Sequence, residues 1–353
     1  YQSGNPTVFN TKQVDFDGTD DYLIANSTLG SFTGSASIWV KRDDFPYSVR
    51  YLLSFRANSG TGYITISYGE EIDVSSGTVY IDGVAGIALP SDTNWHHVFV
   101  SGISLNITES INFAKYFDNN LYNLNGKLSQ VGIFNSTLTA DEVSSLYNHG
   151  LPVDLTTDQA AYTSSSNLVG YWRMGSGTLD SYPLIADQTN ATLGNNLASG
   201  YDFTSGWNTF AAGTLIINST SFSSQSGQGI YAGLGLVANK LYKIKITGTQ
   251  PSGGYFTLKS GTTGTSLKNI STTSFNEEIF ATPTVVTASN NDFYIRLSGH
   301  SAGTVITISN LEIQQVNGNP AMMINLGGGA DFSDGIQNGS PYANIIQNSD
   351  FSD

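Results

Sequence analysis

The chain has 353 residues, contains no cysteine, and carries 28 acidic against 14 basic side chains, which gives a formal net charge of −14 at pH 7. The length is sufficient for two hydrophobic cores, whereas the missing cysteines exclude a disulfide framework, a cysteine-ligated zinc site and a thiol nucleophile. The acidic balance opposes binding to the phosphate backbone of nucleic acids, and without a run of about 18 apolar residues we expect no membrane insertion.

The composition favours short β-strands joined by turns. Charged residues make up 12% of the chain, against about 25% in an average domain, while glycine occurs 38 times. Hydrophobic residues still reach 39%, with 19 tyrosines and 18 phenylalanines. Such a chain can bury enough apolar surface to fold, so we do not expect disorder.

Several strand-like segments lie between residues 13 and 152. Strict alternation over Tyr63–Tyr68 predicts a strand with one buried face. Asp-Gly at 82–83 and Asn-Gly at 125–126 separate further strand-like runs, and these dipeptides tolerate the positive φ of two-residue hairpin turns. Many short strands with regular turn residues favour a β-sandwich over a βαβ arrangement.

A short helix is predicted over residues 139–149. Thr139 and Glu142 have the spacing of a capping box, and Gly150 stands where a left-handed C-cap is expected. An apolar stripe at helical spacing is formed by Val143, Leu146 and Tyr147. One capped helix after many β-patterned segments predicts a sandwich that is closed by this helix.

These segments together resemble a laminin-G-like, concanavalin-type jelly roll. The resemblance rests on Val14–Leu23 as the first strand, Ser37–Lys41 as the next, Asp92–Val100 as a later strand, and the terminal helix, in that order. It covers residues 13–152, after a lead-in segment at 1–12, and implies a jelly-roll β-sandwich.

Residues 153–198 differ in character and are rich in Ser, Thr, Asn and Gly. We interpret them as an ordered connector, in which Tyr171 and Trp172 pack onto a sandwich.

A second β-domain is predicted over residues 199–317, where the alternation of apolar residues with lysines over Leu241–Thr247 indicates a half-buried strand. The order of its strands resembles a β-sandwich of the carbohydrate-binding-module type.

The last segment, residues 318–353, is predicted to be a connector and the start of a further module. Its end, Asn348–Asp353, is similar to the opening of the second domain at Asp202–Thr204. The expected fold is therefore all-β, with two tandem jelly-roll β-sandwiches and one short helix closing the first.

The sequence offers no convincing catalytic constellation. A sandwich hydrolase needs two carboxylates on one strand face, and the nearest cluster is Glu70, Glu71 and Asp73, flanked by loop-like residues. Neighbouring residues of a strand face opposite ways, so His96 and His97 cannot share one metal without a bulge, and we expect them to be structural. We therefore expect a protein that is not an enzyme, with no catalytic residue.

Asp17, Asp20 and Asp21 place three carboxylates in one turn, which is the type of ligand that calcium prefers. The laminin-G-like resemblance implies calcium at the rim of the sandwich. It also implies an acidic pair in the strand before the helix, which Leu128–Gly132 lacks. The alternative is a solvated turn whose aspartates cap their own backbone.

Sugar binding by β-sandwiches uses planar aromatic side chains with polar groups beside them. The candidate platforms are Trp39, Trp207, Tyr231, Tyr255 and Tyr294. For each of them the alternative is a place in the hydrophobic core, where most aromatic residues lie.

A chain that begins at Tyr, without a signal peptide or disulfides, is expected to be part of a larger particle that is assembled in the cytosol. Strings of such modules resemble virion proteins of tailed phages. The leading hypothesis is a non-enzymatic virion protein (fibre, appendage or capsid decoration) that binds other virion subunits and host surface glycans.

The long segments at 153–199 and 318–353, with anchors such as Tyr171 and Met323, predict a homo-oligomer, with a trimer favoured. The alternatives are a secreted bacterial adhesin or lectin and, less favoured, a polysaccharide depolymerase.

Overall fold

The computed structural model describes residues 12–26, 29–45, 48–55, 62–117, 122–181, 183–261, 263–286, 293–324 and 336–338. The chain is 52% strand and 5% helix, which confirms the all-β class. None of the helices in these ranges has the length and apolar character that crossing a membrane requires.

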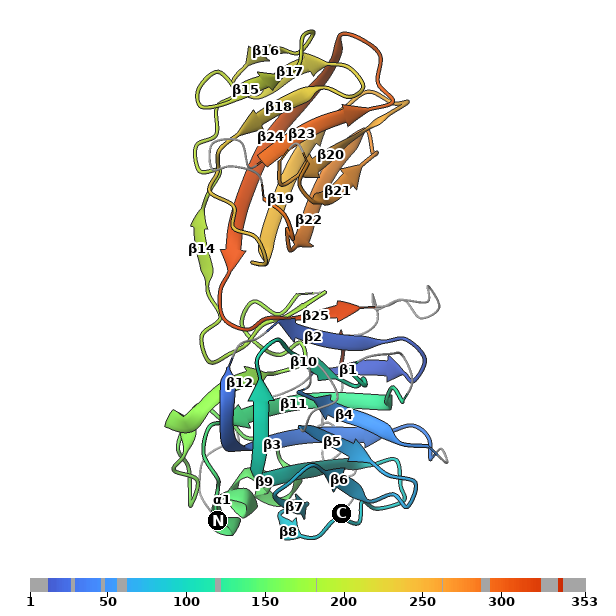
Figure 1. The fold of residues 1–353 in the computed structure, drawn as a ribbon, viewed down its shortest axis with the longest axis vertical. Coiled ribbons are helices and arrows are strands. Elements are labelled where there is room, and N and C mark those ends of the chain that lie inside the picture. Colours follow the sequence, from blue (N-terminus) through green and yellow to red (C-terminus); the bar gives the residue numbers. More distant parts are fainter. Residues whose placement is uncertain are drawn as a thin grey trace, which may run out of the picture. The chain divides into compact units, whose positions relative to one another are not determined.

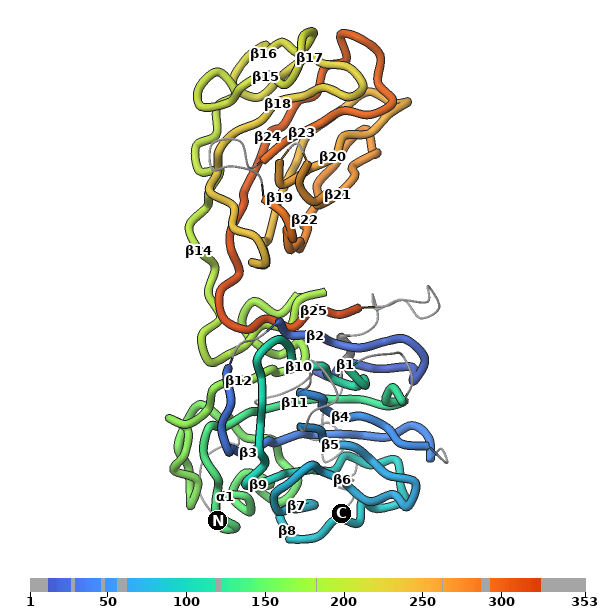
Figure 2. Tube along the Cα trace, in the orientation of Figure 1, coloured from blue at the N-terminus to red at the C-terminus, as the bar shows by residue number. Residues whose placement is uncertain are grey.

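The chain forms two compact units, and the second is inserted into the first (Figure 1). The first unit combines residues Tyr1–Ala191 with Gly318–Asp353, and the second comprises Thr192–Asn317. Figure 2 traces the chain out of the first unit into β14 (Leu193–Asn196) and back into it through β25 (Ala321–Ile324). The sequence suggested two consecutive sandwiches, whereas the first unit here is assembled from two separate stretches of chain.

The first unit contains two antiparallel sheets. The larger has the order β26 (Ile336–Asn338), β1 (Lys12–Asp17), β11 (Asn125–Phe134), β3 (Gly30–Arg42), β9 (Trp95–Ile107), β7 (Thr78–Ile81), β8 (Val84–Ala85), with β12 (Leu168–Trp172) also paired to β11. The smaller has the order β13 (Leu184–Ile185), β25 (Ala321–Ile324), β2 (Tyr22–Asn26), β10 (Ser110–Phe113), β4 (Arg50–Ser54), β5 (Tyr63–Ile66), β6 (Ile72–Val74).

The larger sheet is covered on both faces, because alternate residues of its strands enter two different cores. Val98 and Val100 of β9 belong to the main core with the smaller sheet. Phe99, between them, belongs to a second core with Val143 and Leu146 of the helix. Strands buried on both sides account for the continuous apolar stretches in β9 and β11.

The helix α1 (Ala140–Tyr147) begins as predicted. The Thr139 side chain accepts a hydrogen bond from the Glu142 amide, and the Glu142 carboxylate accepts one from the Thr139 amide, which completes the capping box. The predicted end is wrong, because the left-handed C-cap is Asn148, with φ 44°, rather than Gly150. Asn148, His149 and Gly150 form a 3₁₀ turn, η1 (Asn148–Gly150), so His149 lies beyond the helix.

The segment interpreted as a connector is divided between the two units. Residues 153–191 belong to the first unit, where a second 3₁₀ turn, η2 (Ser165–Asn167), precedes β12. Trp172 enters the main core, and Tyr171 enters the core beside the helix. Both side chains thus pack this segment onto the first sandwich, as predicted.

The second unit is also built from two antiparallel sheets. One has the order β16 (Leu215–Asn218), β17 (Ser221–Ser224), β24 (Thr304–Val316), β19 (Tyr242–Thr249), β22 (Ser274–Ala281), with β14 (Leu193–Asn196) also paired to β24. The other has the order β15 (Asn208–Phe210), β18 (Gly229–Ala232), β23 (Phe293–Ser298), β20 (Tyr255–Lys259), β21 (Ser266–Ile270). The alternation predicted around β19 is confirmed, since Tyr242, Ile244 and Ile246 are buried between the sheets.

The two ends of the inserted unit are paired with each other. Leu193 of β14 lies opposite Val316 of β24, and the Asn317 amide donates to the Thr192 carbonyl over 2.9 Å. Because the chain enters and leaves the unit at adjacent positions, the insertion interrupts the first unit at one place only.

Candidate functional site

A shallow depression on the outer face of the five-stranded sheet in the second unit combines an aromatic ring with cations and hydroxyl groups. We call it the sheet groove. Its side chains come from three adjacent strands: Tyr255, Thr257 and Lys259 of β20, Arg296 and Ser298 of β23, and Ser266 of β21. The groove has a volume of about 240 Å³ and is open to solvent.

Strand register explains why these side chains share one face. On β23, Ile295 and Leu297 are buried between the sheets, so Arg296 and Ser298 point outward. In the ladder with β20, Arg296 lies opposite Thr257, and Ser298 lies opposite Tyr255. The groove is therefore a direct product of period-2 alternation on neighbouring strands.

Three hydroxyl groups of the sheet groove are available to a ligand. Tyr255 is 37% exposed. Within the described part of the chain, the hydroxyls of Tyr255, Ser266 and Ser298 make no hydrogen bond to protein, whereas Thr257 Oγ1 donates to Asn269 Oδ1 over 2.7 Å. An aromatic face beside several free hydroxyls is the combination that sugar recognition requires.

The remaining aromatic candidates in the second unit are mostly covered. Tyr231 stacks on Tyr294 with ring centroids 5.1 Å apart, and Tyr294 is only 2% exposed. Trp207 is buried in the core, edge-on to Phe203 and Phe293. As open sugar platforms, Tyr294 and Trp207 are therefore wrong predictions, and Tyr231 offers at most one ring face.

Trp39 is also a wrong prediction as a sugar platform. It does point away from the main core, as expected for the opposite strand face, but it is 1% exposed. His97 and Tyr147 stack on it with centroids 5.0 and 6.1 Å away. The sequence could not show that α1 covers this face, whereas the predicted platform Tyr255 does line a groove.

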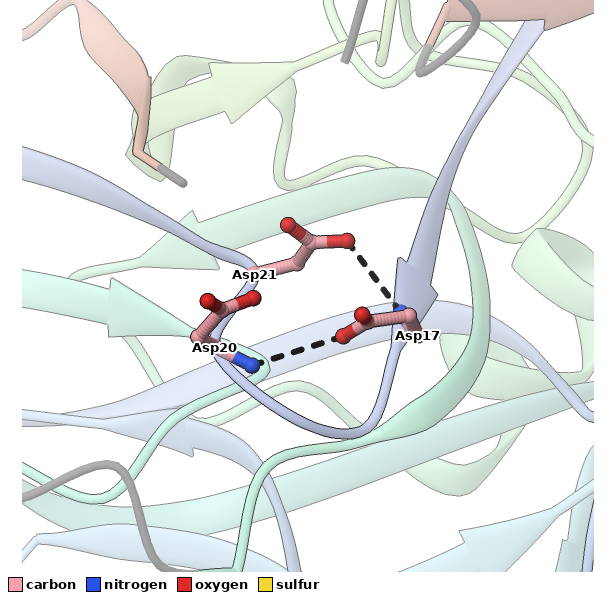
Figure 3. A group of neighbouring side chains, drawn as sticks. All are labelled: Asp17, Asp20 and Asp21. Atoms are coloured by element: carbon pink, nitrogen blue, oxygen red, sulfur yellow. Dashed lines mark hydrogen bonds between the residues drawn. The ribbon is translucent and has the colours of Figure 1, made fainter. Parts of the chain in front are cut away.

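The three aspartates of the first unit lie together at the end of β1 (Figure 3). One carboxylate oxygen from each of Asp17, Asp20 and Asp21 lies within 4.8 Å of the others. Asp20 and Asp21 are buried, at 7% and 3% exposed, whereas Asp17 is exposed. The oxygens are close enough to share one cation.

Both interpretations of this acidic turn have support in its hydrogen bonds. Asp17 Oδ1 accepts from the Thr19 amide over 2.8 Å, and Asp21 Oδ2 accepts from the Asp17 amide over 3.3 Å, so the turn caps its own backbone. Asp21 Oδ1, however, is buried without a hydrogen-bond partner among the described residues. A buried carboxylate oxygen without a donor is costly unless a cation or a proton neutralises it.

The electrostatics of Asp21 follow from this crowding. Burial is the largest cause that raises the pKa of Asp21 to about 6, and the neighbouring Asp17, Asp20 and Asp15 carboxylates act in the same direction. The backbone hydrogen bond to the Asp17 amide acts in the opposite direction. A bound divalent cation would remove the cause of this shift, because it stabilises the charged carboxylate.

The two adjacent histidines of β9 face opposite ways, as expected. His96 bridges two carboxylates, with Nδ1 2.7 Å from Asp82 and Nε2 3.0 Å from Asp92. Burial disfavours its charged form, but the hydrogen bonds to Asp82 and Asp92 raise the pKa of His96. This arrangement fixes the turn after β7 and is structural.

His97 forms a pair with Ser37 that no sequence pattern predicted. Ser37 Oγ lies 2.8 Å from His97 Nε2, and both residues are fully buried. Burial lowers the pKa of His97 to about 4, and no hydrogen bond from a described residue reaches its Nδ1. A serine and a histidine from paired strands give no sequence motif, and this pair has no access to a substrate.

The remaining polar candidates are His300 and the acidic residues Glu70, Glu71 and Asp73. His300 is buried, with Nε2 3.1 Å from Gln250 Oε1. Glu70 lies 3.7 Å from Arg42 in a turn, while Glu71 and Asp73 are exposed at the edge of the smaller sheet.

Comparisons with known proteins give distant likenesses. No protein-family model matches the chain, and no curated protein does. Among solved structures, a native heptameric SAP-like pentraxin from Limulus polyphemus is 12% identical, with 40% of this chain and 84% of that chain covered and a TM-score of 0.27. Domains LG4-5 of the mouse laminin alpha1 chain are 12% identical, with 92% and 94% covered and a TM-score of 0.25.

A third similar structure is the binding domain of botulinum neurotoxin DC in complex with rat synaptotagmin II, at 9% identity. It covers 89% of this chain and 93% of that chain, with a TM-score of 0.18. Laminin G domains are thus among the structures that this chain resembles, and none of the three is a phage virion protein. At these scores no residue role is transferred from them.

Proposed function

We propose that the protein is a non-enzymatic glycan-binding module that uses the sheet groove of the second unit. The observation that carries this proposal is the placement of Tyr255 beside hydroxyl groups that have no partner in the described chain. An aromatic ring can stack on the apolar face of a pyranose, and the hydroxyls of Ser266 and Ser298 can pair with those of the sugar. A host-surface glycan would be a suitable ligand for an adhesion protein.

A glycan array followed by calorimetry of the oligosaccharides that bind tests this proposal. Tyr255→Ala is expected to weaken binding by about tenfold or more, the loss that corresponds to ~1.4 kcal/mol. Tyr68→Ala is the matched control, because Tyr68 is exposed and lies in the first unit. Equal affinity for the two variants would count against the groove, and no binding to any glycan would count against the function.

A second candidate function is calcium binding at Asp17, Asp20 and Asp21. The specific observation is the buried Asp21 Oδ1 that lacks a partner beside two further carboxylates. Calcium takes six to eight oxygen ligands, so backbone carbonyls or water would have to complete the shell. Titration with calcium should show binding that Asp21→Asn abolishes and that Asp141→Asn, on the exposed side of α1, leaves unchanged.

We also propose that this module belongs to a phage virion and acts there as a fibre, appendage or decoration. The absence of cysteine supports a protein that is assembled in the cytosol. Electron microscopy of particles that carry a labelled chain would test the location.

Homo-oligomerisation remains part of this proposal, but two residues that were expected to contact neighbouring subunits do not reach the surface. Tyr171 and Met323, considered as anchors for neighbouring subunits, are buried within the first unit of the same chain. The large subunit interfaces would therefore have to use other surfaces. Light scattering at micromolar concentration distinguishes a trimer from a monomer.

A further inference from the structure

The charge of the sheet groove differs from that of the chain. Acidic residues outnumber basic ones by 28 to 14 in the sequence, yet the groove is lined by Lys259 and Arg296 and by no Asp or Glu among the described residues. The sheet groove is therefore a region of local positive charge in a protein whose net charge is −14. Local positive charge attracts anions and raises their concentration at the site.

Arg296 is held in a defined orientation. Its Nε donates to the Gly227 carbonyl over 3.0 Å, and its guanidinium lies 5.7 Å from the centre of the Phe210 ring. One row across β15, β18 and β23 consists of Phe210, Gly229 and Arg296. Gly229, in the middle of this row, has no side chain that would separate the Phe210 ring from the guanidinium. The arginine is thus positioned from two sides before any ligand arrives.

The terminal nitrogens of Arg296 remain for a ligand. No described residue forms an ion pair with this guanidinium, and its hydrogen bond to the described chain uses Nε alone. The two Nη groups of a guanidinium match the spacing of two oxygens in a carboxylate or sulfate, which gives a bidentate, charge-assisted pair. The neighbouring strand carries Thr257, directly opposite Arg296, and Tyr255. A sugar ring on Tyr255 and its anionic group at Arg296 would therefore be bound side by side.

We infer that the sheet groove selects an acidic saccharide, in which the sugar carries a carboxylate or a sulfate ester, over a neutral one. This inference rests on the proposed glycan-binding function. Arg296 binds the anionic group, Lys259 adds positive charge on the same strand face as Tyr255, and Tyr255 supplies the contact to the sugar ring. Charge-assisted hydrogen bonds of this kind correspond to a preference of about 10- to 100-fold.

Calorimetry of the whole chain with matched ligands tests the inference. The ligands are a uronic-acid tetrasaccharide, the same tetrasaccharide after reduction of its carboxyl groups to alcohols, and a sulfated galactan tetrasaccharide. At least one anionic ligand should bind about 10-fold or more tightly than the neutral one, and the difference should shrink as salt is added. The better anionic ligand then identifies the group that Arg296 prefers.

Arg296→Gln should remove this preference, whereas Lys268→Gln, which removes a positive charge from an exposed position of β21 that does not line the groove, should keep it. If Arg296→Gln fails to fold, Lys259→Gln provides the test and should reduce the preference. Equal binding of neutral and anionic ligands would overturn the inference and leave the glycan-binding function intact. Binding of none of the three by a chain that recognises other glycans would also overturn it, and a chain that recognises no glycan would overturn both proposals.

Discussion

Leu23 of β2 and Met323 of β25 lie opposite each other in one antiparallel ladder, although the entire second unit separates them in the sequence. Both side chains are buried in the first unit. The smaller sheet is therefore complete only when the chain has returned from the insertion. This pairing makes the stability of the first unit depend on residues beyond 317.

Met323→Ala should lower the free energy of unfolding of the first unit by about 2–5 kcal/mol, because it leaves a cavity in the core. Met322→Ala, one residue earlier on the partly exposed face of β25, should cost clearly less. Urea unfolding followed by tryptophan fluorescence measures both variants. Similar losses for the two would contradict the register of β25.

Removing the insertion gives a second test of this architecture. A chain in which a short Gly-Ser linker joins Ala191 to Gly318 keeps β25 and should show a folded, cooperative first unit. A chain that stops at Ala191 exposes the edge of β2 and should be less stable and prone to association. If the shorter chain is as stable as the linked one, β25 does not contribute as described.

Thr139→Ala should destabilise the first unit by about 0.5–2 kcal/mol, since it removes the N-cap of α1. Thr137→Ala, at an exposed position two residues earlier, is the matched control and should have little effect. The difference between their urea midpoints is the measurement, and an unchanged midpoint for Thr139→Ala would contradict the capping box.

Asp21 should make the protein lose stability as the pH rises from about 4 to about 6 in the absence of metal. The pKa of Asp21 is raised to about 6 in the folded state, so between these values the folded state binds more protons than the unfolded state. Above about 6 the buried charge lowers the free energy of unfolding. Asp21→Asn should remove this decrease, which is read from unfolding curves of both proteins at pH 4, 5, 6 and 7.

Added calcium would act in the opposite direction. It should raise the melting temperature at pH 7, where Asp21 is charged, more than at pH 4. An equal rise at both pH values, or the same rise in Asp21→Asn, would place the bound ion elsewhere.

Ser37 should not react with a fluorophosphonate probe directed at catalytic serines, although His97 lies within hydrogen-bond distance. Both residues are fully buried, and the low pKa of His97 makes its imidazole a weak base. Intact-mass spectrometry after exposure to the probe gives the answer. Labelling of Ser37 would show that this pair is accessible and would reopen a hydrolytic function.

The elements predicted best were those whose residues contact each other within a few positions. The capping box at Thr139 depends on a residue three positions away, and the alternation around Ile244 depends on the strand itself. The predicted end of α1 is wrong because Asn148 also tolerates a left-handed backbone and lies two residues before Gly150, the expected C-cap.

Residues with partners far along the chain were predicted poorly. Trp39 was correctly placed on the strand face opposite Val40, but whether that face met solvent or a helix depended on the later packing of α1. The groove around Arg296 depends on the pairing of β20 with β23, and no local motif records that pairing.

The sequence by itself determined the all-β class, the helix start, the acidic turn and the aromatic content, because alternation, capping and composition are local properties. The tertiary structure decided that one unit is nested in the other, that Asp21 is buried, and that Tyr255 rather than Trp39 lines a groove. These outcomes depend on strand register and on which elements cover each sheet. Both follow from the free energy of packing the whole chain, to which residues far apart in the sequence contribute together.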